Sequence, residues 1–161
     1  LVAHSSALKK KKFRFEELKI NELGSGYYFN PIVFEINDIK EIDGEKFGPI
    51  LHFIRYKQEE LDDLIDQVNA TGYGLTMGAH TRVLGKANRI FKKANVGNFY
   101  LNRDIVGAVV GVQPFGGHGL SGTGPKAGGP NYLKSFLNEK TFTDNVMATG
   151  GNIDLLNKNN Q

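Results

Sequence analysis

The stretch EELDDLIDQVNATGYGLTMGAHTRVLGKANRIFKKANVGNFYLN, residues 59 to 102, decides the fold of this chain. Its first part predicts an amphipathic helix, because apolar side chains recur at helical spacing at Leu61, Leu64, Ile65 and Val68. Residues 69 to 72 end this helix. A second helix is expected after Thr81, whose hydroxyl can cap it, and its apolar face comprises Val83, Ala87, Ile90, Phe91 and Ala94.

The segments around these helices predict β-strands, because they are rich in aromatic and β-branched residues. Two of them, residues 73 to 80 and 96 to 102, lie in the stretch itself. Two more precede it, at residues 27 to 36 and 50 to 56, and Pro31 assigns the earlier one to an edge or a bulge. Strands that alternate with helices in this way predict an α/β fold with parallel strands and helical crossovers.

The composition is that of an ordinary globular domain of 161 residues. A net charge of +3 is too small to indicate a nucleic-acid surface. The chain has no cysteine, which rules out a disulfide, a thiolate zinc site and a cysteine nucleophile within it. No apolar run approaches the ~20 residues of a membrane span, and no secretory signal is recognisable. We therefore expect no membrane span and a cytoplasmic location.

The segment GGHGLSG fits the dinucleotide-binding pattern G-x-G-x-x-G at Gly117, Gly119 and Gly122. That pattern needs a strand before it and a helix after it, so that the helix N-terminus can face the pyrophosphate. Here Pro114 interrupts any strand, and the prolines and glycines that follow Gly122 exclude a helix. We interpret the glycines as sites of close backbone approach or as donors of N–H groups to an anion.

Basic residues and histidines offer little further chemistry. The run Lys9 to Lys12 suits a phosphate-binding patch, but lysines at a helix end are more often simply solvated. His4, His52 and His80 are too scattered to suggest a metal site, and we expect no metal. His118 stands among flexible glycines and is interpreted as an exposed loop residue.

Three segments together resemble the C-terminal part of the aldehyde dehydrogenase superfamily. They are EKFGPIL (Glu45 to Leu51), NATGYGLTMGAHT (Asn69 to Thr81) and VGNFYLN…QPFGGHGLSGTG (Val96 to Gly124). Further, DIVGAVVGVQPFGGHGLSGTGPKAGGPNYL resembles the Δ1-pyrroline-5-carboxylate (glutamate semialdehyde) dehydrogenases, including the module within bifunctional proline utilisation A proteins. The resemblance covers residues 27 to 152 well and the first 26 loosely.

The resemblance implies an NAD-dependent oxidation of L-glutamate γ-semialdehyde to glutamate in bacterial proline catabolism. In that family a cysteine thiolate attacks the aldehyde, hydride passes to NAD⁺, and water releases the acid. The nucleophile, the glutamate base and the Rossmann NAD domain lie upstream of the matching region. We therefore expect a fragment with no catalytic residue and no activity alone. Residues 1–137 would form a partial catalytic domain, and 138–161 a tail with an oligomerisation-flap strand near residues 140 to 147, after a short helix at 132 to 137.

The resemblance also implies binding residues. Glu45 matches the glutamate that holds the nicotinamide ribose, and Phe47 matches a phenylalanine beside that ribose. Gly107 and Ala108 match the loop whose N–H groups anchor the carboxylate of the aldehyde substrate, and Phe115 matches the aromatic over its methylene chain. Related enzymes often carry serine where Ala108 stands, so one side-chain hydrogen bond to the substrate is missing here.

Two other functions remain open from the sequence. The glycine-rich segment could form an independent nucleotide- or phosphate-binding module. Alternatively, the chain is a structural remnant or an assembly element without activity of its own. Whether the chain is a dehydrogenase fragment or a structural remnant of one, we expect a homo-oligomer or association with the portion that carries the nucleophile. The reason is that an isolated fragment exposes sheet edges and apolar faces.

Overall fold

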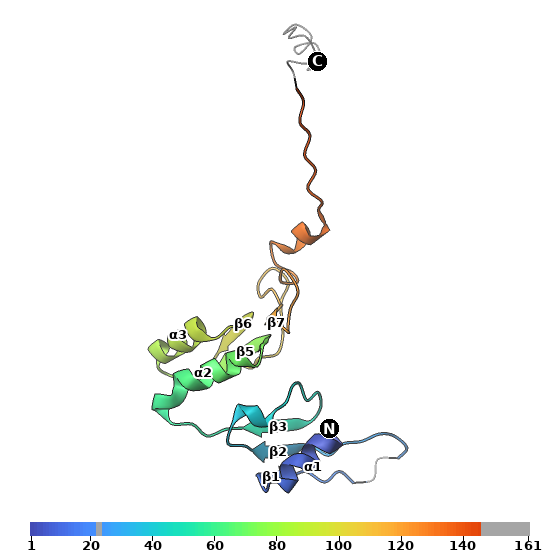
Figure 1. Cartoon of the computed structure of the whole chain (residues 1–161), viewed down its shortest axis with the longest axis vertical. Helices are drawn as coiled ribbons and strands as arrows, with labels where there is room; N and C mark the ends of the chain where they lie inside the picture. The colour runs from blue at the N-terminus through green and yellow to red at the C-terminus, as the bar shows by residue number, and fades with distance from the viewer. Residues whose placement is uncertain (22–23, 146–161) are drawn as a thin grey trace.

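The computed structural model describes residues 1–21 and 24–145, which form two units and an extended tail (Figure 1). The first unit contains helix α1 (Val2–Lys10), strands β1 (Arg14–Glu17), β2 (Ile32–Glu35) and β3 (Ile50–Phe53), and the short 3-10 helix η1 (Ile39–Glu41). The second unit follows the 3-10 helix η2 (Gln58–Glu60) and contains helices α2 (Leu61–Ala70) and α3 (Leu84–Lys93), with strands β4 (Tyr73–Gly74), β5 (Thr76–Ala79), β6 (Asn98–Leu101) and β7 (His118–Gly119).

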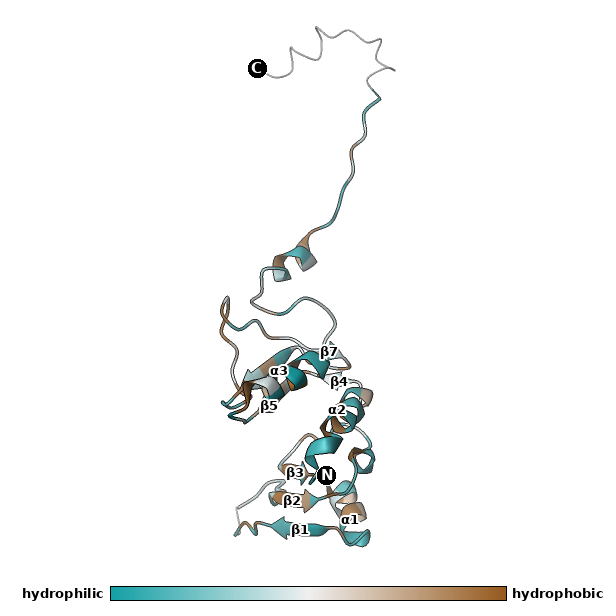
Figure 2. Ribbon diagram, turned by 90° about the vertical axis from the view of Figure 1, so that its left-hand side faces the viewer, coloured by the Kyte–Doolittle hydropathy of each residue, from teal (hydrophilic) through white to brown (hydrophobic). Residues whose placement is uncertain are grey.

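The first unit is a three-stranded sheet in the order β1-β2-β3. β1 runs antiparallel to β2, whereas β3 runs parallel to it, with Phe34 opposite Phe15 and His52. The sequence did not indicate α1 or β1, and β1 is largely hydrophilic (Figure 2). Because β1 adds a strand on the outer side, β2 is central, and the expectation of an edge or bulge at Pro31 was wrong. Pro31 is tolerated because it stands just before the first residue of the strand.

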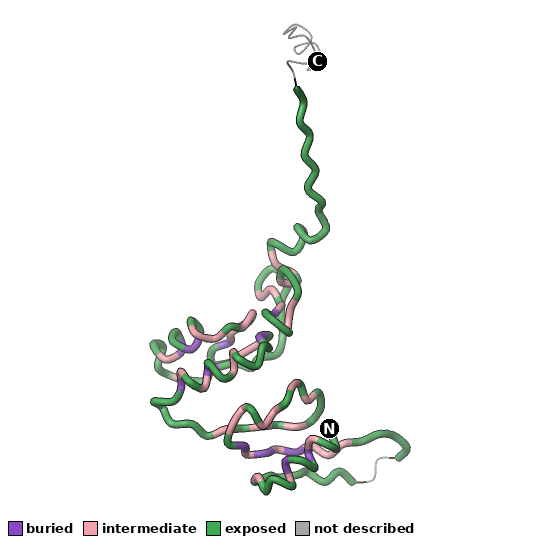
Figure 3. Tube along the Cα trace, viewed as in Figure 1, coloured by how far each residue is buried: buried purple, intermediate pink, exposed green. Residues whose placement is uncertain are grey.

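The core of the first unit lies between α1 and β2 (Figure 3). It consists of Leu8 from α1 together with Ile32, Phe34 and Ile36, of which Phe34 is fully buried. The strand expected from residue 27 begins only at Ile32, and Tyr27 is exposed. The reason is that β1 ends at Glu17, opposite Ile32, so no partner strand continues beyond that pair.

The second unit confirms the helix–strand alternation of the central stretch. α3 connects β5 to β6, and these two strands are parallel, with Thr76 opposite Asn98. Their core contains Leu61, Ile65 and Ile90 of the two helices, which are buried as the helical spacing predicts, together with Ala79 of β5. Val83 and Phe91 were wrongly assigned to the apolar face, since both side chains are exposed. Val83 precedes α3, and the hydroxyl of Thr81 accepts a hydrogen bond from its N–H group.

The four expected strands do not share one parallel sheet. β2 and β3 belong to the first unit, while β5 and β6 form a separate two-stranded sheet. The strand expected at residues 73 to 80 is divided at Leu75, and its first part, β4, pairs antiparallel with β7. Tyr73 and Gly74 therefore pair with the distant residues Gly119 and His118, while the carbonyl of Gly74 accepts a hydrogen bond from the N–H of Gly97, the residue before β6.

The tail leaves the second unit through the 3-10 helix η3 (Tyr132–Phe136), where the sequence predicts a short helix. Residues 138 to 145 continue as an exposed extended segment without a strand (Figures 1 and 3). The expected strand at 140 to 147 lies partly outside the described residues, as do residues 146 to 161. Its assignment to an oligomerisation flap stays a prediction. None of the helices in the described ranges has the length and apolarity to cross a membrane.

Polar contacts fasten α1 and the residue after it to the rest of the first unit. Nε2 of His4 lies 2.9 Å from Nε2 of His52 on β3, although the two histidines are far apart in the sequence. Lys9 and Lys11 form ion pairs with Glu17 and Glu41 at 2.8 and 2.5 Å, respectively, so these two lysines of the basic run bind the protein's own carboxylates. His80 does not join the pair, and no group of three metal-ligating side chains occurs in the described part of the chain.

The histidine pair predicts a stability that falls on mild acidification. Burial lowers the pKa of both His4 and His52, and nearby positive charge, including Lys46, lowers it further. Below the ordinary histidine pKa near 6.5, the unfolded chain therefore binds protons that the folded pair resists. The free energy of unfolding should be fully present above that pH and should decrease from pH 7 to pH 5, as measured by urea denaturation.

Replacing one member of the pair should remove part of this pH dependence. In His4→Phe, the loss of stability between pH 7 and pH 5 should be smaller than in the wild type. His80→Phe, which changes an exposed histidine outside the pair, should retain the wild-type loss. An identical pH dependence in all three proteins would contradict the role assigned to the pair.

Candidate functional site

The glycine-rich segment folds back onto the second unit instead of forming a nucleotide-binding turn. Gly119 pairs with Tyr73 in the β4–β7 ladder, and residues 123 to 131 form bends and turns without a helix. A Cβ atom at Gly122 would collide with the carbonyl of Gly117, so these glycines pack against one another. The structure therefore agrees with close backbone approach and lacks the strand–turn–helix arrangement that a dinucleotide needs.

A second close approach joins this segment to β6. A Cβ atom at Gly97 would collide with the carbonyl oxygen of Gly116, and one at Gly117 would lie 2.8 Å from the carbonyl oxygen of Gly74. The amino group of Lys126 donates a hydrogen bond to the carbonyl of Gly97. Three segments that are distant in the sequence thus meet backbone to backbone, because none of them carries a side chain at the contact.

Phe115 is held by this arrangement and lies at the surface. Its N–H donates to the carbonyl of Ala127 at 3.0 Å, and the N–H of Ala127 donates back at 2.8 Å. Its side chain is partly exposed, at 36%. On either side of it, the carbonyl of Pro114 and the N–H of Gly116 both bond to the side-chain amide of Asn98. The aromatic ring is therefore presented from a backbone that is fixed on both sides.

Gly107 and Ala108 lie in the loop that follows β6, at the end of the strand where parallel sheets form their binding sites. Gly107 has a φ of +97°, which glycine adopts without strain, and its carbonyl accepts a hydrogen bond from the hydroxyl of Tyr100 at 3.1 Å. Both residues are exposed. The loop also exposes a group of apolar side chains, Ile105, Val106, Val109, Val110 and Val112.

Glu45 and Phe47 belong to the first unit, in the loop between η1 and β3. Glu45 lines a cavity of about 810 Å³ whose walls come from both units, with His52 on one side and Val68 and Leu75 on the other. Its carboxylate forms no hydrogen bond or ion pair with any described residue, whereas the neighbouring Lys46 pairs with Asp43. Phe47 projects outward and is 89% exposed.

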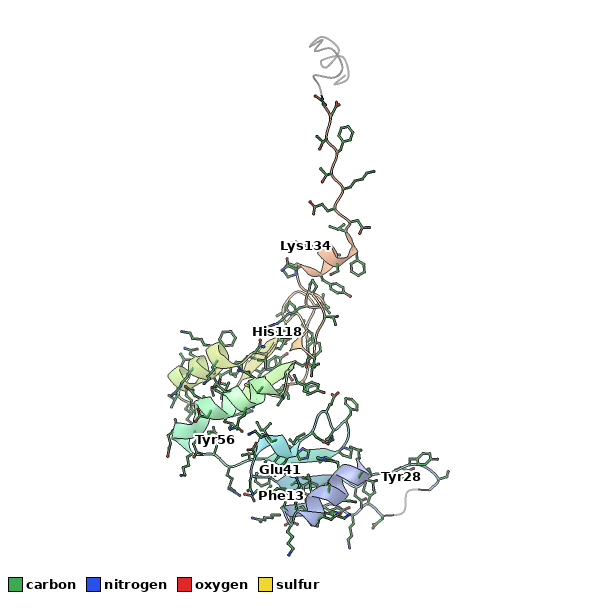
Figure 4. The ribbon with its side chains drawn as sticks, viewed as in Figure 1. Phe13, Tyr28, Glu41, Tyr56, His118 and Lys134 are labelled. Carbon is green, nitrogen blue, oxygen red and sulfur yellow. The ribbon has the colours of Figure 1, made fainter. Side chains whose placement is uncertain are left out.

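The expected site residues thus form two groups. Glu45 lines the cavity between the units, while Gly107, Ala108 and Phe115 lie outside its lining. His118 lies on β7 (Figure 4) and is exposed as expected, with its Nδ1 2.9 Å from the amide oxygen of Asn95.

Sequence reasoning missed several polar residues that hold the glycine-rich segment. Asn98 is buried, Lys126 bonds to Gly97, and the hydroxyl of Ser121 accepts a hydrogen bond from the N–H of Gly74 at 3.1 Å. A signal for Asn98 was available, because asparagine is depleted in strands and is an exception as the first residue of NFYL. Nothing in the sequence alone indicates the partners of Ser121 and Lys126.

Comparison with known proteins gives the family of this chain. The model of the aldehyde dehydrogenase family matches residues 9–142, and the chain belongs to this family. Its homologues are bifunctional PutA proteins and 1-pyrroline-5-carboxylate dehydrogenases. The chain is 55% identical over 116 residues to the bifunctional protein PutA of Escherichia coli (strain K12), covering 72% of this chain and 9% of that protein. It is 42% identical over 121 residues to the 1-pyrroline-5-carboxylate dehydrogenase of Oceanobacillus iheyensis, covering 74% of this chain and 23% of that enzyme.

Solved structures agree with this assignment. A mutant of proline utilization A from Bradyrhizobium japonicum superimposes with a TM-score of 0.78 at 45% identity, covering 93% of this chain and 15% of that one. The fold is therefore part of an aldehyde dehydrogenase fold with mixed α/β content. The chain spans about a tenth to a quarter of the length of the curated relatives named above.

The packing of Gly97 gives a test of the site's architecture. Gly97→Ala should lower the free energy of unfolding by about 2 kcal/mol, because the added methyl group overpacks a backbone contact. Gly85→Ala is the matched control, since its Cβ would meet open space on α3 and should stabilise the helix by about 0.5 kcal/mol. Urea denaturation measures both values. Equal stability of the two variants would show that the contact at Gly97 is not tight.

Proposed function

We propose that this chain is part of an NAD-dependent L-glutamate γ-semialdehyde (1-pyrroline-5-carboxylate) dehydrogenase, which oxidises the aldehyde to glutamate. The observation that carries the proposal is the 42% identity to a named 1-pyrroline-5-carboxylate dehydrogenase across the segments that contain Glu45 and Phe115. The similarity to bifunctional PutA proteins supports the same reaction. The substrate is a small aldehyde that carries a carboxylate.

Glu45 and Phe47 are the proposed cofactor contacts. The Glu45 carboxylate lines the cavity and has no partner among the described residues, so it is available to accept hydrogen bonds from two ribose hydroxyls. The exposed ring of Phe47 offers an apolar surface beside the same ribose. When bound, NAD⁺ supplies the acceptor for the hydride. The contribution of this chain is to orient the nicotinamide end of the cofactor.

Gly107, Ala108 and Phe115 are the proposed substrate contacts. Gly107 and Ala108 are small and exposed, so their N–H groups can approach a carboxylate without steric hindrance. Phe115 would cover the methylene chain of the substrate with its partly exposed ring. The hydrogen bonds of Asn98 to Pro114 and Gly116, and of Ala127 to Phe115, form a clamp around Phe115. This clamp fixes the surface before the substrate binds, which lowers the entropic cost of binding.

The nucleophile must come from residues outside these 161. The chain has no cysteine, so the thiolate that forms the covalent intermediate in this family is not among them. We propose that residues 1–137 form part of a catalytic domain and that 138–161 form an assembly tail. The chain alone is then inactive, and most of the cofactor is bound by a domain that these residues do not contain.

Assembly is the second candidate function. It is favoured by the exposed apolar side chains of the tail region: Tyr132, Leu133, Phe136, Leu137 and Phe142. An extended segment like residues 138 to 145, whose backbone groups pair with no other described residue, is suited to adding a strand to another sheet. We propose that the partner is a second copy of this chain or the portion that carries the nucleophile.

Activity measurements test the dehydrogenase proposal. The purified 161-residue chain should show no reduction of NAD⁺ at 340 nm with 1-pyrroline-5-carboxylate, because it lacks a thiol. The same chain joined to the upstream part of the Oceanobacillus iheyensis enzyme should oxidise this substrate. Turnover by the chain alone, or a joined enzyme that folds but acts only on other aldehydes, would contradict the proposal.

Glu45 can be tested in the same joined enzyme. Glu45→Gln keeps the shape of the side chain but weakens its hydrogen bonds to the ribose hydroxyls, so KM for NAD⁺ should rise about tenfold. Glu59→Gln removes an equal charge from an exposed position on η2 and should leave KM unchanged. Steady-state kinetics with NAD⁺ as the varied substrate distinguish the two. A normal KM in Glu45→Gln would exclude the cofactor role.

A further inference from the structure

Asn98 is the buried polar side chain of the second unit that no proposed role yet uses. It is only 8% exposed, and Ser5 on α1 is the other buried polar residue in the described ranges. Asn98 lies at the start of β6, where its backbone pairs with Thr76 on β5. Burying a side-chain amide is costly unless its donors and acceptor form hydrogen bonds. The hydrogen-bond partners of Asn98 therefore indicate which part of the structure it holds in place.

The partners of Asn98 are the two backbone groups that flank Phe115. Its amide nitrogen donates to the carbonyl of Pro114 at 2.9 Å, and its amide oxygen accepts from the N–H of Gly116 at 3.4 Å. A side-chain amide carries a donor nitrogen and an acceptor oxygen in one plane. These two groups can therefore bond at once to the carbonyl before Phe115 and to the N–H after it. An aspartate offers no donor at neutral pH, and a leucine offers neither group.

Two further contacts hold the same segment from other directions. Phe115 and Ala127 exchange a pair of backbone hydrogen bonds, and the backbone of Gly116 lies directly against Gly97, the residue before Asn98. Lys126 donates to the carbonyl of Gly97 and so ties the Ala127 side of the pair to β6 as well. The backbone of Phe115 is therefore enclosed, while its ring remains at the surface.

We propose that Asn98 is a positioning residue that fixes the ring of Phe115 for binding of the substrate's methylene chain. This inference rests on the proposed function for the substrate, but the clamp itself is a property of the chain alone. Asn98 does not touch the substrate and acts through the backbone of Phe115. It thereby fixes the position of the Phe115 ring relative to β6, one of the two parallel strands of this unit.

Hydrogen exchange on the 161-residue chain tests the clamp without any assay of activity. In Asn98→Leu, exchange of the Phe115 and Ala127 amides should accelerate by about tenfold, because two hydrogen bonds that hold the segment are lost. Asn98→Asp keeps an acceptor for the N–H of Gly116 but loses the donor to Pro114, so it should also accelerate exchange, and it guards against a packing effect specific to leucine. The amide of Asn102, which bonds to the carbonyl of Ala79, reports whether β6 stays folded.

Asn102, which follows the last residue of β6, provides a matched control at the other end of the strand. Its side-chain amide also forms a donor–acceptor pair, with the carbonyl and the N–H of Thr81, but that pair holds no part of the Phe115 segment. Asn102→Asp should therefore leave exchange at Phe115 and Ala127 unchanged. Unchanged exchange at these two amides in both Asn98 variants would overturn the proposal.

Kinetics of the joined enzyme separate positioning from simple loss of structure. In Asn98→Asp, KM for the aldehyde should rise about tenfold while kcat stays within about twofold of the wild-type value. Faster exchange together with an unaltered KM would overturn the substrate role of Asn98. A joined wild-type enzyme that folds but does not oxidise the aldehyde would instead refute the proposed function, while the exchange data still decide the clamp.

Discussion

The backbone contact between Gly97 and Gly116 is the constraint on which the second unit depends. It brings the glycine-rich segment within hydrogen-bonding distance of β6, and the bonds of Asn98 and Lys126 follow from that distance. A side chain at Gly97 would separate the two segments by the thickness of a methyl group or more. The position of Phe115 relative to β6 is therefore set first by the lack of a side chain at Gly97.

Apolar burial holds each unit together, and charge contributes little to either. The α2–α3 pair is bridged by Arg89 with Asp62 and by Lys93 with Asp66, both at 2.7 Å, but these pairs are solvent-exposed and stabilise weakly. The buried residues Ile65 and Ile90 carry the contact instead. Because the cavity beside Glu45 takes its walls from both units, its shape depends on how α2 and β4 pack against the loop before β3.

The helical spacing of apolar residues made the two helices of the second unit predictable. The elements and residues that were predicted wrongly have local physical causes. The spacing of Leu61, Ile65 and Ile90 identified both helices, since burial of one helical face leaves a clear trace in the sequence. Residues of α1 lack such a stripe, so that helix was missed, and Phe91 follows the spacing but is exposed. The candidate site residues came from resemblance, because the neighbours that hold them, such as Asn98 for Phe115, lie in other segments.

The sequence by itself determined the alternation of strands and helices from residue 59 to 102, the lack of a thiol, and the failure of GGHGLSG as a nucleotide fingerprint. These are local properties, because they depend on residues within one or two turns of one another. Only the tertiary structure decided that Gly119 pairs with Tyr73, that His4 meets His52, and that Asn98 brackets Phe115. Each of these contacts joins residues that are distant in the sequence. They can form only after the packing of the whole fold has brought the two segments together.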